Sequence, residues 1–164
     1  MKALDITALR DLIGLCAKKG VTVGCAESCT GGLIAKYLTD APGSSAVLQG
    51  GFVTYTNELK MSLLGVEKRL IEEHTEVSHP CAKAMAEGAR ARLGVTVALS
   101  STGYAGPGGG TEADPVGTVY LGISTPTGTQ TERLSLSPEM TREQIREAAA
   151  SRALELLQSY LNKI

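Results

Sequence analysis

The sequence predicts an α/β fold: a single domain with three α/β/α layers and a mixed, largely buried sheet. Short runs rich in β-branched residues alternate along the chain with segments of helical periodicity, the pattern of helices that cover both faces of a sheet. A length of 164 residues suits one domain with a sizeable core. The chain contains no internal repeat and no low-complexity linker, so residues 1–164 are predicted to form one domain.

The first third of the chain is predicted to alternate between helix and strand. An apolar stripe with i, i+3, i+4, i+7 spacing indicates a helix that ends near Gly20. A buried strand over residues 21–26 follows, then a helix over about residues 31–40. Residues 46–56 have the composition of a strand, and their double glycine at 50–51 is expected at a bulge or a close approach. The stripe consists of Leu9, Leu12, Ile13 and Cys16.

Three helices are predicted next. Asn57 is expected to be the N-cap of a helix through residue 64, which Gly65 stops. A short charged helix covers residues 67–74, and Ser78 is expected to cap a third helix that ends at Gly94. The apolar stripe of this third helix consists of Ala82, Met85, Ala86, Ala89 and Leu93.

The last part of the chain is predicted to complete the sheet and add one helix. A strand over residues 95–101 leads into a glycine-rich loop. Residues 116–125 and 130–136 form a strand pair around a turn at residues 126–129, and a terminal helix spans about residues 138–161.

Composition excludes several classes of function. The formal net charge is -1, so no overall field attracts nucleic acid or an anionic membrane. No apolar stretch approaches the roughly 20 residues needed to span a bilayer, and residues 1–5 contain no hydrophobic region of a signal peptide. The cysteines lack C-x-x-C spacing, so we expect a soluble protein of the reducing cytoplasm with free thiols. These cysteines are Cys16, Cys25, Cys29 and Cys81.

The segment at residues 26–32 is the first candidate for chemistry, because it lies between a predicted strand and a predicted helix. Backbone N–H groups at a helix start have no partner within the helix and can receive a phosphate or a developing oxyanion. Ser28 at this turn is therefore a candidate nucleophile or anion ligand. In the alternative interpretation, Ser28 or Thr30 only caps the helix. The turn has neither a Gly-x-Ser-x-Gly motif nor a Walker lysine.

Tyr55 and Lys60 form the second candidate, at a strand end and in the first turn of the following helix. The positive end of the helix dipole and burial would both lower the pKa of Lys60 from about 10.4 toward that of a general base for a serine. In the alternative, Lys60 is exposed and Tyr55 belongs to the core. His74 and His79 are in sequences typical of exposed positions, which argues against a Ser-His-Asp arrangement, and no metal-ligand cluster is predicted.

The loop at residues 101–111 is the third candidate. Its glycines allow backbone N–H groups to approach an anion closely. The loop is either a ligand-binding loop or a flexible surface connection. Pro107 and Pro115 favour restrained geometry.

Together these segments resemble the CinA carboxy-terminal domain family, the bacterial nicotinamide-nucleotide amidases that deamidate nicotinamide mononucleotide. The resemblance covers about residues 5–160, with the family's motifs in the family's order. The matching segments are residues 26–32, 42–45, 55–60, 64–66, 77–78, 84–90, 102–107, 115–119 and 142–146.

The resemblance implies a Ser/Lys amidohydrolase without cofactor or metal, acting on a small mononucleotide and assembling as a homodimer. Ser28 would be the nucleophile and Lys60 its base, Tyr55 and Thr102 would be hydrogen-bonding supports, and Arg142 would assist by repelling the ammonium form of Lys60. N–H groups around residues 29–31 would hold the oxyanion. From the chemistry of its glycines, and not from the resemblance, we expect the loop at residues 106–110 to meet the 5′-phosphate. The expected substrate contacts are Cys29, Thr30, Gly31, Gly103, Gly106 and Gly108.

Three features depart from the family pattern or leave alternatives open. Tyr104 replaces an expected small aliphatic residue and would narrow the pocket. The Gly-Asp pair that usually precedes the family arginine is absent, so Arg142 and Arg146 could exchange roles. Cys29 is a rival nucleophile, because a helix start can lower the pKa of a thiol.

Many relatives carry an additional molybdopterin-binding-like domain with pyrophosphatase activity, which we expect this chain to lack.

Two further classes of function remain open at this point. In one, the chain is a non-catalytic module that binds a mononucleotide or phosphate and keeps Lys60 protonated. In the other, it is a scaffold that acts through a protein surface. Release of ammonia from nicotinamide mononucleotide separates the hydrolase from both.

Overall fold

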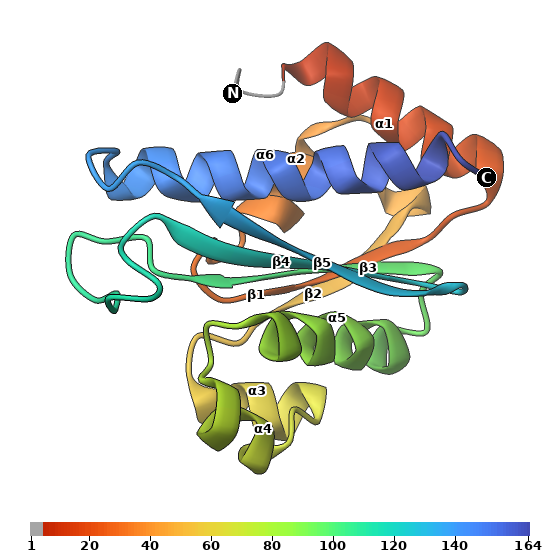
Figure 1. Cartoon of the computed structure of the whole chain (residues 1–164). Coiled ribbons are helices and arrows are strands. Elements are labelled where there is room, and N and C mark those ends of the chain that lie inside the picture. Colours follow the sequence, from red (N-terminus) through yellow and green to blue (C-terminus); the bar gives the residue numbers. More distant parts are fainter. Residues whose placement is uncertain (1–4) are drawn as a thin grey trace.

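A five-stranded mixed sheet in the order β2-β1-β3-β4-β5 divides the protein into three layers (Figure 1). β1 pairs in parallel with β2 and β3, whereas β3, β4 and β5 are successively antiparallel. The predicted α/β class and mixed sheet are therefore confirmed. The strands are β1 (Val23–Glu27), β2 (Leu48–Val53), β3 (Val97–Gly103), β4 (Thr118–Thr125) and β5 (Gly128–Ser135).

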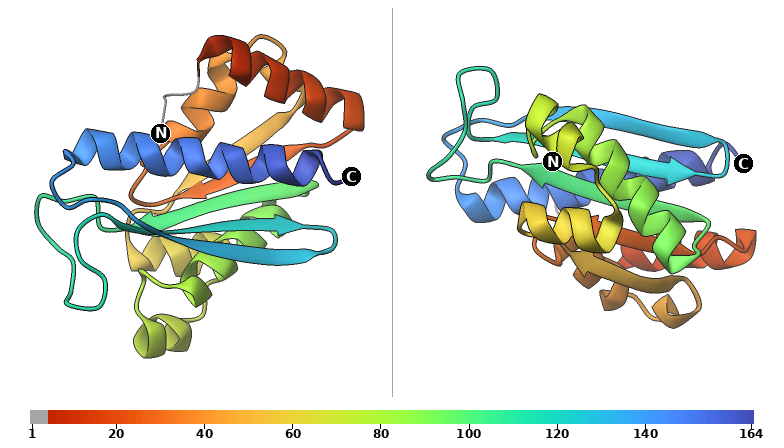
Figure 2. Two further views of the ribbon diagram at one scale, coloured as in Figure 1. Left: turned by 45° about the horizontal axis from the view of Figure 1, so that its top comes forward. Right: turned by 90° about the horizontal axis from the view of Figure 1, so that it is seen from below.

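The helices cover both faces of the sheet. α1, α2 and α6 lie on one face, and α3, α4 and α5 lie on the other (Figures 1 and 2). A 3-10 turn, Ser44–Ala46, precedes β2. The helices are α1 (Ile6–Lys19), α2 (Leu33–Asp40), α3 (Asn57–Leu64), α4 (Lys68–His74), α5 (His79–Leu93) and α6 (Arg142–Leu161).

The computed structural model describes residues 5–164. Residues 1–4 belong to the segment in which we predict no hydrophobic leader, and they lie outside the described residues. Among residues 5–164, no helix combines the length and apolar character needed to cross a membrane.

Glycine stops and polar caps set most helix boundaries as predicted. Gly20, Gly65 and Gly94 follow α1, α3 and α5 with φ values of 66°, 71° and 63°, the left-handed region that glycine adopts without steric cost. Ser78 caps α5 by accepting a hydrogen bond from the Cys81 amide. The predicted stops and this cap are confirmed.

Two predicted helix starts are wrong. The N-cap of α3 is Thr56, not Asn57, because the Thr56 hydroxyl accepts the Leu59 amide at 3.3 Å. The last helix begins at Arg142 rather than near residue 138. Thr141 and Gln144 form a capping box there, each side chain bonding the other's backbone amide, and this reciprocal pair defines the helix start.

The strands are displaced by a few residues from their predicted limits, but the double glycine has the predicted role. The register between β1 and β2 shifts after Val23, which pairs with Leu48, while Gly24 pairs with Gly50. A Cβ atom at Gly51 would lie 2.6 Å from the Cys25 sulfur. The segment therefore combines a bulge with a close approach to the neighbouring strand.

Burial along the strands follows their place in the sheet. β1 and β4 are buried at every position, whereas the edge strands β2 and β5 alternate between more and less exposed residues. The larger apolar cluster lies between the sheet and α1, α2 and α6, and a second cluster lies under α3, α4 and α5.

The topology brings three strand ends to one edge of the sheet. β1, β2 and β3 are parallel, so their carboxyl ends point the same way, and β1 lies between the other two. The connection from β1 to β2 passes through α2 on one face of the sheet, and the connection from β2 to β3 passes through α3, α4 and α5 on the other face. The strand order reverses at β1 and β3, and such a switch point favours a crevice at the carboxyl ends of the strands. Ser28, Thr54 and the end of β3 at Thr102 and Gly103 lie there.

Close packing between α3 and α5 generates a stability prediction. A Cβ atom at Gly88 on α5 would lie 2.1 Å from the Leu64 carbonyl oxygen at the end of α3. We expect Gly88→Ala to lower the free energy of unfolding by about 1–3 kcal/mol, because backbone must move. Gly14→Ala is the matched control: it is also within a helix, has nothing within 4 Å, and should stabilise by about 0.5–1 kcal/mol. Urea unfolding measures both, and equal effects would contradict the packing argument.

Candidate active site

Ser28 and Lys60 meet at the carboxyl edge of the sheet. Lys60 Nζ lies 3.2 Å from Ser28 Oγ and donates a hydrogen bond to the Thr54 carbonyl oxygen at 3.0 Å. Side chains of a helix point back toward its start. The Lys60 side chain therefore extends from α3 toward the end of β2, where Thr54 lies. Lys60 is only 1% exposed, so the alternative of a lysine on a solvated helix face is wrong.

Burial is the main influence on Lys60. It lowers the pKa of the amine from its ordinary value, while the charges of nearby groups, including Glu76 and Glu58, oppose this. No carboxylate of residues 5–164 forms a salt bridge with Lys60. The predicted direction of the shift is confirmed, but burial rather than repulsion by Arg142 is its main cause. The amine can therefore lose its proton more readily than an exposed lysine can.

The turn after β1 presents two free amides. The Ser28 amide donates to the Ser101 carbonyl at 2.9 Å, and the Gly31 amide donates to the Ser28 carbonyl at 3.1 Å. The amides of Cys29 and Thr30 donate no hydrogen bond within the described part of the chain. Cys29 lines the pocket beside Ser28, whereas Thr30 is fully buried and does not, so the Cys29 amide is the free N–H group next to the cavity.

Glu27 occupies the start of α2, a role that the sequence interpretation missed. Its buried carboxylate accepts hydrogen bonds from the amides of Gly32, Ile34 and Ala35 at 2.9, 3.1 and 2.9 Å and from the Thr30 hydroxyl at 2.6 Å. The general rule for helix starts suggested that the first amides of α2 could receive a phosphate. They are not free to do so, because Glu27 already accepts their hydrogen bonds. A carboxylate shortly before a helix was the available signal.

A pocket of about 320 Å³ opens beside Ser28. Of the predicted substrate contacts, Cys29 and Gly103 line it, and so does Tyr104, the bulky residue expected to narrow it. The five predicted catalytic residues all line it: Ser28, Tyr55, Lys60, Thr102 and Arg142.

Arg142 and Arg146 have different partners, and only Arg142 lines the pocket. Arg142 donates to the Tyr55 hydroxyl at 2.8 Å and to the Gly106 carbonyl at 2.7 Å, and it lines the pocket. Arg146 donates to the carbonyls of Cys29 and Thr30 at 3.1 and 2.8 Å. Arg146 therefore holds the turn from behind, and Arg142 faces the cavity.

Tyr55 and Thr102 line the pocket, but their hydrogen bonds go to groups other than Ser28 and Lys60. Tyr55 is 57% exposed, so the alternative of a core tyrosine is wrong. The Thr102 hydroxyl donates to the Glu76 carbonyl at 2.6 Å. Neither side chain forms a hydrogen bond with Ser28 or Lys60 among the contacts of residues 5–164.

The remaining predicted contacts lie outside the pocket lining. The Thr30 hydroxyl is buried and lies 2.6 Å from Ser101 Oγ as well as from Glu27. Gly31 uses its amide within the turn, and Gly106 contributes its carbonyl to Arg142. Gly108 is exposed on the loop.

Cys29 lacks the properties of a nucleophile. Its side chain is 5% exposed, and burial raises the pKa of its thiol to about 12. The thiol therefore stays protonated near neutral pH, whereas the Ser28 hydroxyl has an amine beside it. All four cysteines are free and buried.

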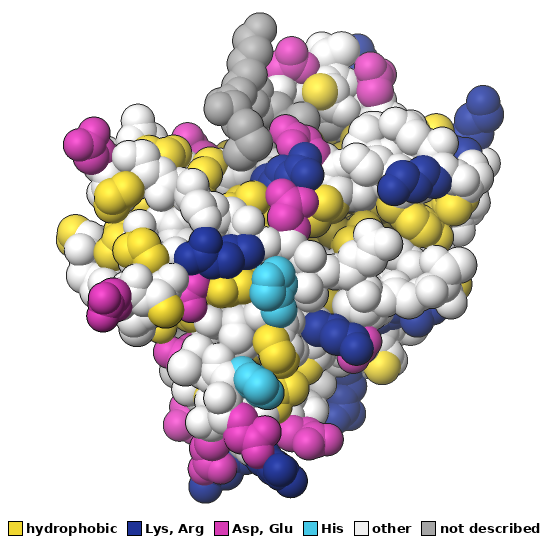
Figure 3. Space-filling view, in the orientation of Figure 1, with side chains coloured by type: hydrophobic (Ala, Val, Ile, Leu, Met, Phe, Trp, Pro, Cys, Tyr) yellow, Lys and Arg dark blue, Asp and Glu magenta, His cyan; other side chains and the backbone are white. Residues whose placement is uncertain are grey.

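Neither histidine belongs to the pocket. His74 and His79 are both exposed, as predicted, on the face shown in Figure 3. His79 contacts Thr131 through Nδ1 at 2.8 Å and stacks edge-on against Tyr120.

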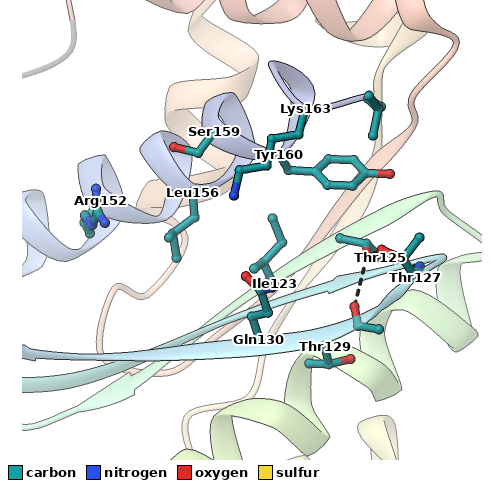
Figure 4. A pocket seen from close by; sticks show the side chains of 12 residues that line it. Ile123, Thr125, Thr127, Thr129, Gln130, Arg152, Leu156, Ser159, Tyr160 and Lys163 are labelled. Atoms are coloured by element: carbon teal, nitrogen blue, oxygen red, sulfur yellow. Dashed lines mark hydrogen bonds between the residues drawn. The ribbon is translucent and has the colours of Figure 1, made fainter.

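A larger cavity of about 660 Å³ lies between α6 and the hairpin of β4 and β5 (Figure 4). Arg152 lines it, but its guanidinium is engaged by Glu132 and Glu155 at 2.8–2.9 Å. No nucleophile with an adjacent base is among its lining residues. The smaller pocket at Ser28 is therefore the candidate site despite its size.

Fold and site together define an α/β domain with a buried Ser-Lys pair at the switch point of its sheet. The family model of the CinA C-terminal domain matches residues 6–161. The chain belongs to this family.

Curated relatives match nearly the whole chain. A protein of Symbiobacterium thermophilum named "Putative competence-damage inducible protein" is 49% identical over 96% of this chain and 39% of its own length. A protein of Shewanella oneidensis named "Nicotinamide-nucleotide amidohydrolase PncC" is 45% identical over 87% of this chain and 33% of its own length. The chain thus spans about a third of the length of the curated relatives it matches.

Solved structures of CinA-type proteins share the fold. The competence/damage inducible protein CihA of Agrobacterium tumefaciens is 40% identical with a TM-score of 0.87, covering 94% of this chain and 95% of that one. A CinA superfamily protein of Escherichia coli is 30% identical with a TM-score of 0.91, covering 98% and 92%.

The lowered pKa of Lys60 predicts a pH-dependent stability. Between the lowered pKa and the ordinary value of ~10.4, the unfolded chain binds more protons, so wild-type stability rises with pH. Lys60→Met removes this group, so its stability relative to wild type should fall as pH increases from neutral toward ~10.4, by at most about 1.4 kcal/mol per pH unit. Urea unfolding over this range tests it. Lys18→Met controls for the loss of one exposed amine, and a constant difference for Lys60→Met would contradict the lowered pKa.

Proposed function

We propose that the chain is an amidohydrolase that converts nicotinamide mononucleotide to nicotinate mononucleotide and ammonia by a Ser/Lys mechanism. The observation that carries the proposal is the distance of 3.2 Å between Ser28 Oγ and a buried Lys60 amine with a lowered pKa. The family and the name of the Shewanella oneidensis relative supply the substrate.

Acylation begins with neutral Lys60. Its amine takes the Ser28 proton, and Ser28 Oγ forms a bond to the carboxamide carbon of the substrate. The electron pair of the carbonyl moves to its oxygen, and the free amide of Cys29, which lines the pocket, is the donor for this oxyanion. This amide belongs to the turn that follows Ser28.

Collapse of the tetrahedral intermediate breaks the C–N bond. The Lys60 ammonium returns its proton to the leaving nitrogen, so ammonia departs and a Ser28 ester remains. Water then attacks the ester carbon while Lys60 again accepts a proton. Release of the acid restores the Ser28 hydroxyl and the neutral amine.

Arg142 is the cation of the pocket wall, held by Tyr55 and the Gly106 carbonyl. Guanidinium groups bind phosphate well because of their planar set of donors. We therefore propose that the 5′-phosphate binds at Arg142 and the adjoining loop at residues 106–110. In this arrangement Arg142 recognises the substrate instead of shifting the pKa of Lys60.

The competing function is a module that binds a mononucleotide without cleaving it. In such a module Lys60 would remain protonated as a charge partner. An amine buried without a carboxylate is an unfavourable charge partner, which favours the hydrolase. Saturable binding without release of ammonia would identify the module.

Separate substitutions of Ser28 and Cys29 by alanine test which residue is the nucleophile. We expect Ser28→Ala to lower kcat for ammonia release by about 10³-fold or more, because the attacking oxygen is lost. Cys29→Ala should retain activity within about tenfold, because the thiol is buried and protonated. Steady-state release of ammonia from nicotinamide mononucleotide measures both. Activity that survives in Ser28→Ala and disappears in Cys29→Ala would overturn the assignment.

The pH profile tests the base. Because only neutral Lys60 accepts the proton, kcat/KM should rise with pH through a pKa lower than ~10.4. Lys60→Ala should lower kcat by about 10²–10⁴-fold and should lose this limb of the profile. A rising limb that persists unchanged in Lys60→Ala would assign the base to another group.

A further inference from the structure

Glu76 brings a negative charge to the wall of the pocket at Ser28. Its side chain is half-buried and forms no salt bridge or hydrogen bond within residues 5–164. Asp114 is also half-buried, but unlike Glu76 it forms a salt bridge, with Arg133 at 3.1 Å. Glu76 therefore remains an unpaired carboxylate in a partly desolvated position.

The backbone holds Glu76 in place by an unusual conformation. Thr75 has φ 67° and ψ 166°, and it is the one non-glycine residue with positive φ among residues 5–164. A β-branched residue adopts this region only under strain, and such strain is concentrated at functional sites. The Thr102 hydroxyl binds the Glu76 carbonyl at 2.6 Å, and the Ser78 hydroxyl binds the Thr75 carbonyl at 3.0 Å.

Tyr104 supplies an aromatic wall near this carboxylate. The ring packs against the apolar cluster of Val77, Ala82 and Tyr120 and lies near Gly109, where a Cβ atom would be 3.4 Å from Tyr104 Cδ1. Burial raises the pKa of the Tyr104 phenol, and the charge of Glu76 adds to this, consistent with their proximity. The face of a phenol ring attracts cations.

The pocket lining contains charges of both signs, and within residues 5–164 Glu76 and Arg142 form no salt bridge with each other. Glu76 contributes a negative charge, Arg142 contributes a positive charge, and Lys60 is the base. Such an arrangement complements a ligand that carries both a cation and an anion.

We propose that Glu76 is a specificity-determining residue that selects a cationic ring, an N-substituted pyridinium carboxamide, with Tyr104 stacked against that ring. The identity of the ligand rests on the proposed function. In this arrangement the pyridinium nitrogen lies toward Glu76, the phosphate toward Arg142, and the carboxamide toward Ser28. A neutral ring of the same shape gains nothing from Glu76.

The experiment compares two ligands that differ in ring charge. Nicotinamide mononucleotide has a cationic ring, and its dihydro form has a neutral ring with the same ribose phosphate and carboxamide. Binding is measured by calorimetry on Ser28→Ala protein, which prevents turnover. We expect nicotinamide mononucleotide to bind about tenfold more tightly than the dihydro form, a free-energy difference of about 1.4 kcal/mol.

Glu76→Gln in the same background should lower the affinity for nicotinamide mononucleotide about tenfold and change that for the dihydro form less than twofold. Retained binding of the dihydro form shows that the variant is folded. Glu67→Gln is the matched control, because this exposed carboxylate makes no capping hydrogen bond and does not line the pocket. It should change neither affinity.

Equal weakening of both ligands by Glu76→Gln, no weakening of either, or no binding of either ligand would overturn the role of Glu76. An assay of ammonia release by the wild-type protein distinguishes failure of the role of Glu76 from failure of the proposed hydrolase function. Ammonia release with an unchanged preference in Glu76→Gln refutes the ring-charge inference alone. Charge-selective binding without ammonia release refutes the hydrolase alone.

Discussion

The burial of the Lys60 amine without a carboxylate partner is the constraint on which the site depends. A charged ammonium in such a place is costly, so the environment favours the neutral form that a base requires. The amine has only oxygen atoms of Ser28 and Thr54 as partners in the described chain. The packing of α3 against α5, where Gly88 admits the Leu64 carbonyl, holds the lysine in this position.

Glu27 and Arg146 complement this arrangement from the other face of the sheet. Glu27 satisfies the first amides of α2, and Arg146 binds the carbonyls of Cys29 and Thr30. Both side chains thus bond the turn from the face of α2 and α6, and the amides of Cys29 and Thr30 are left without a partner in the described chain.

Three ionisable residues of the pocket differ in their electrostatic surroundings. Burial lowers the pKa of Lys60, Arg142 provides a cation that donates to the Tyr55 hydroxyl, and the Glu76 carboxylate has no partner in the described chain. Parallel strands explain why these groups can converge, because residues distant in sequence follow strand ends at one edge of the sheet.

Local features were determined by the sequence alone. The alternation of helix and strand, the glycine stops at Gly20, Gly65 and Gly94, and the bulge at the double glycine all follow from residues within a few positions of one another. The five catalytic residues that the family motifs implied are all among the residues that line the pocket. Only the tertiary structure decided that Lys60 is buried and that Arg142 rather than Arg146 faces the cavity. Burial and proximity depend on packing between segments far apart in the chain, which neither periodicity nor spacing records.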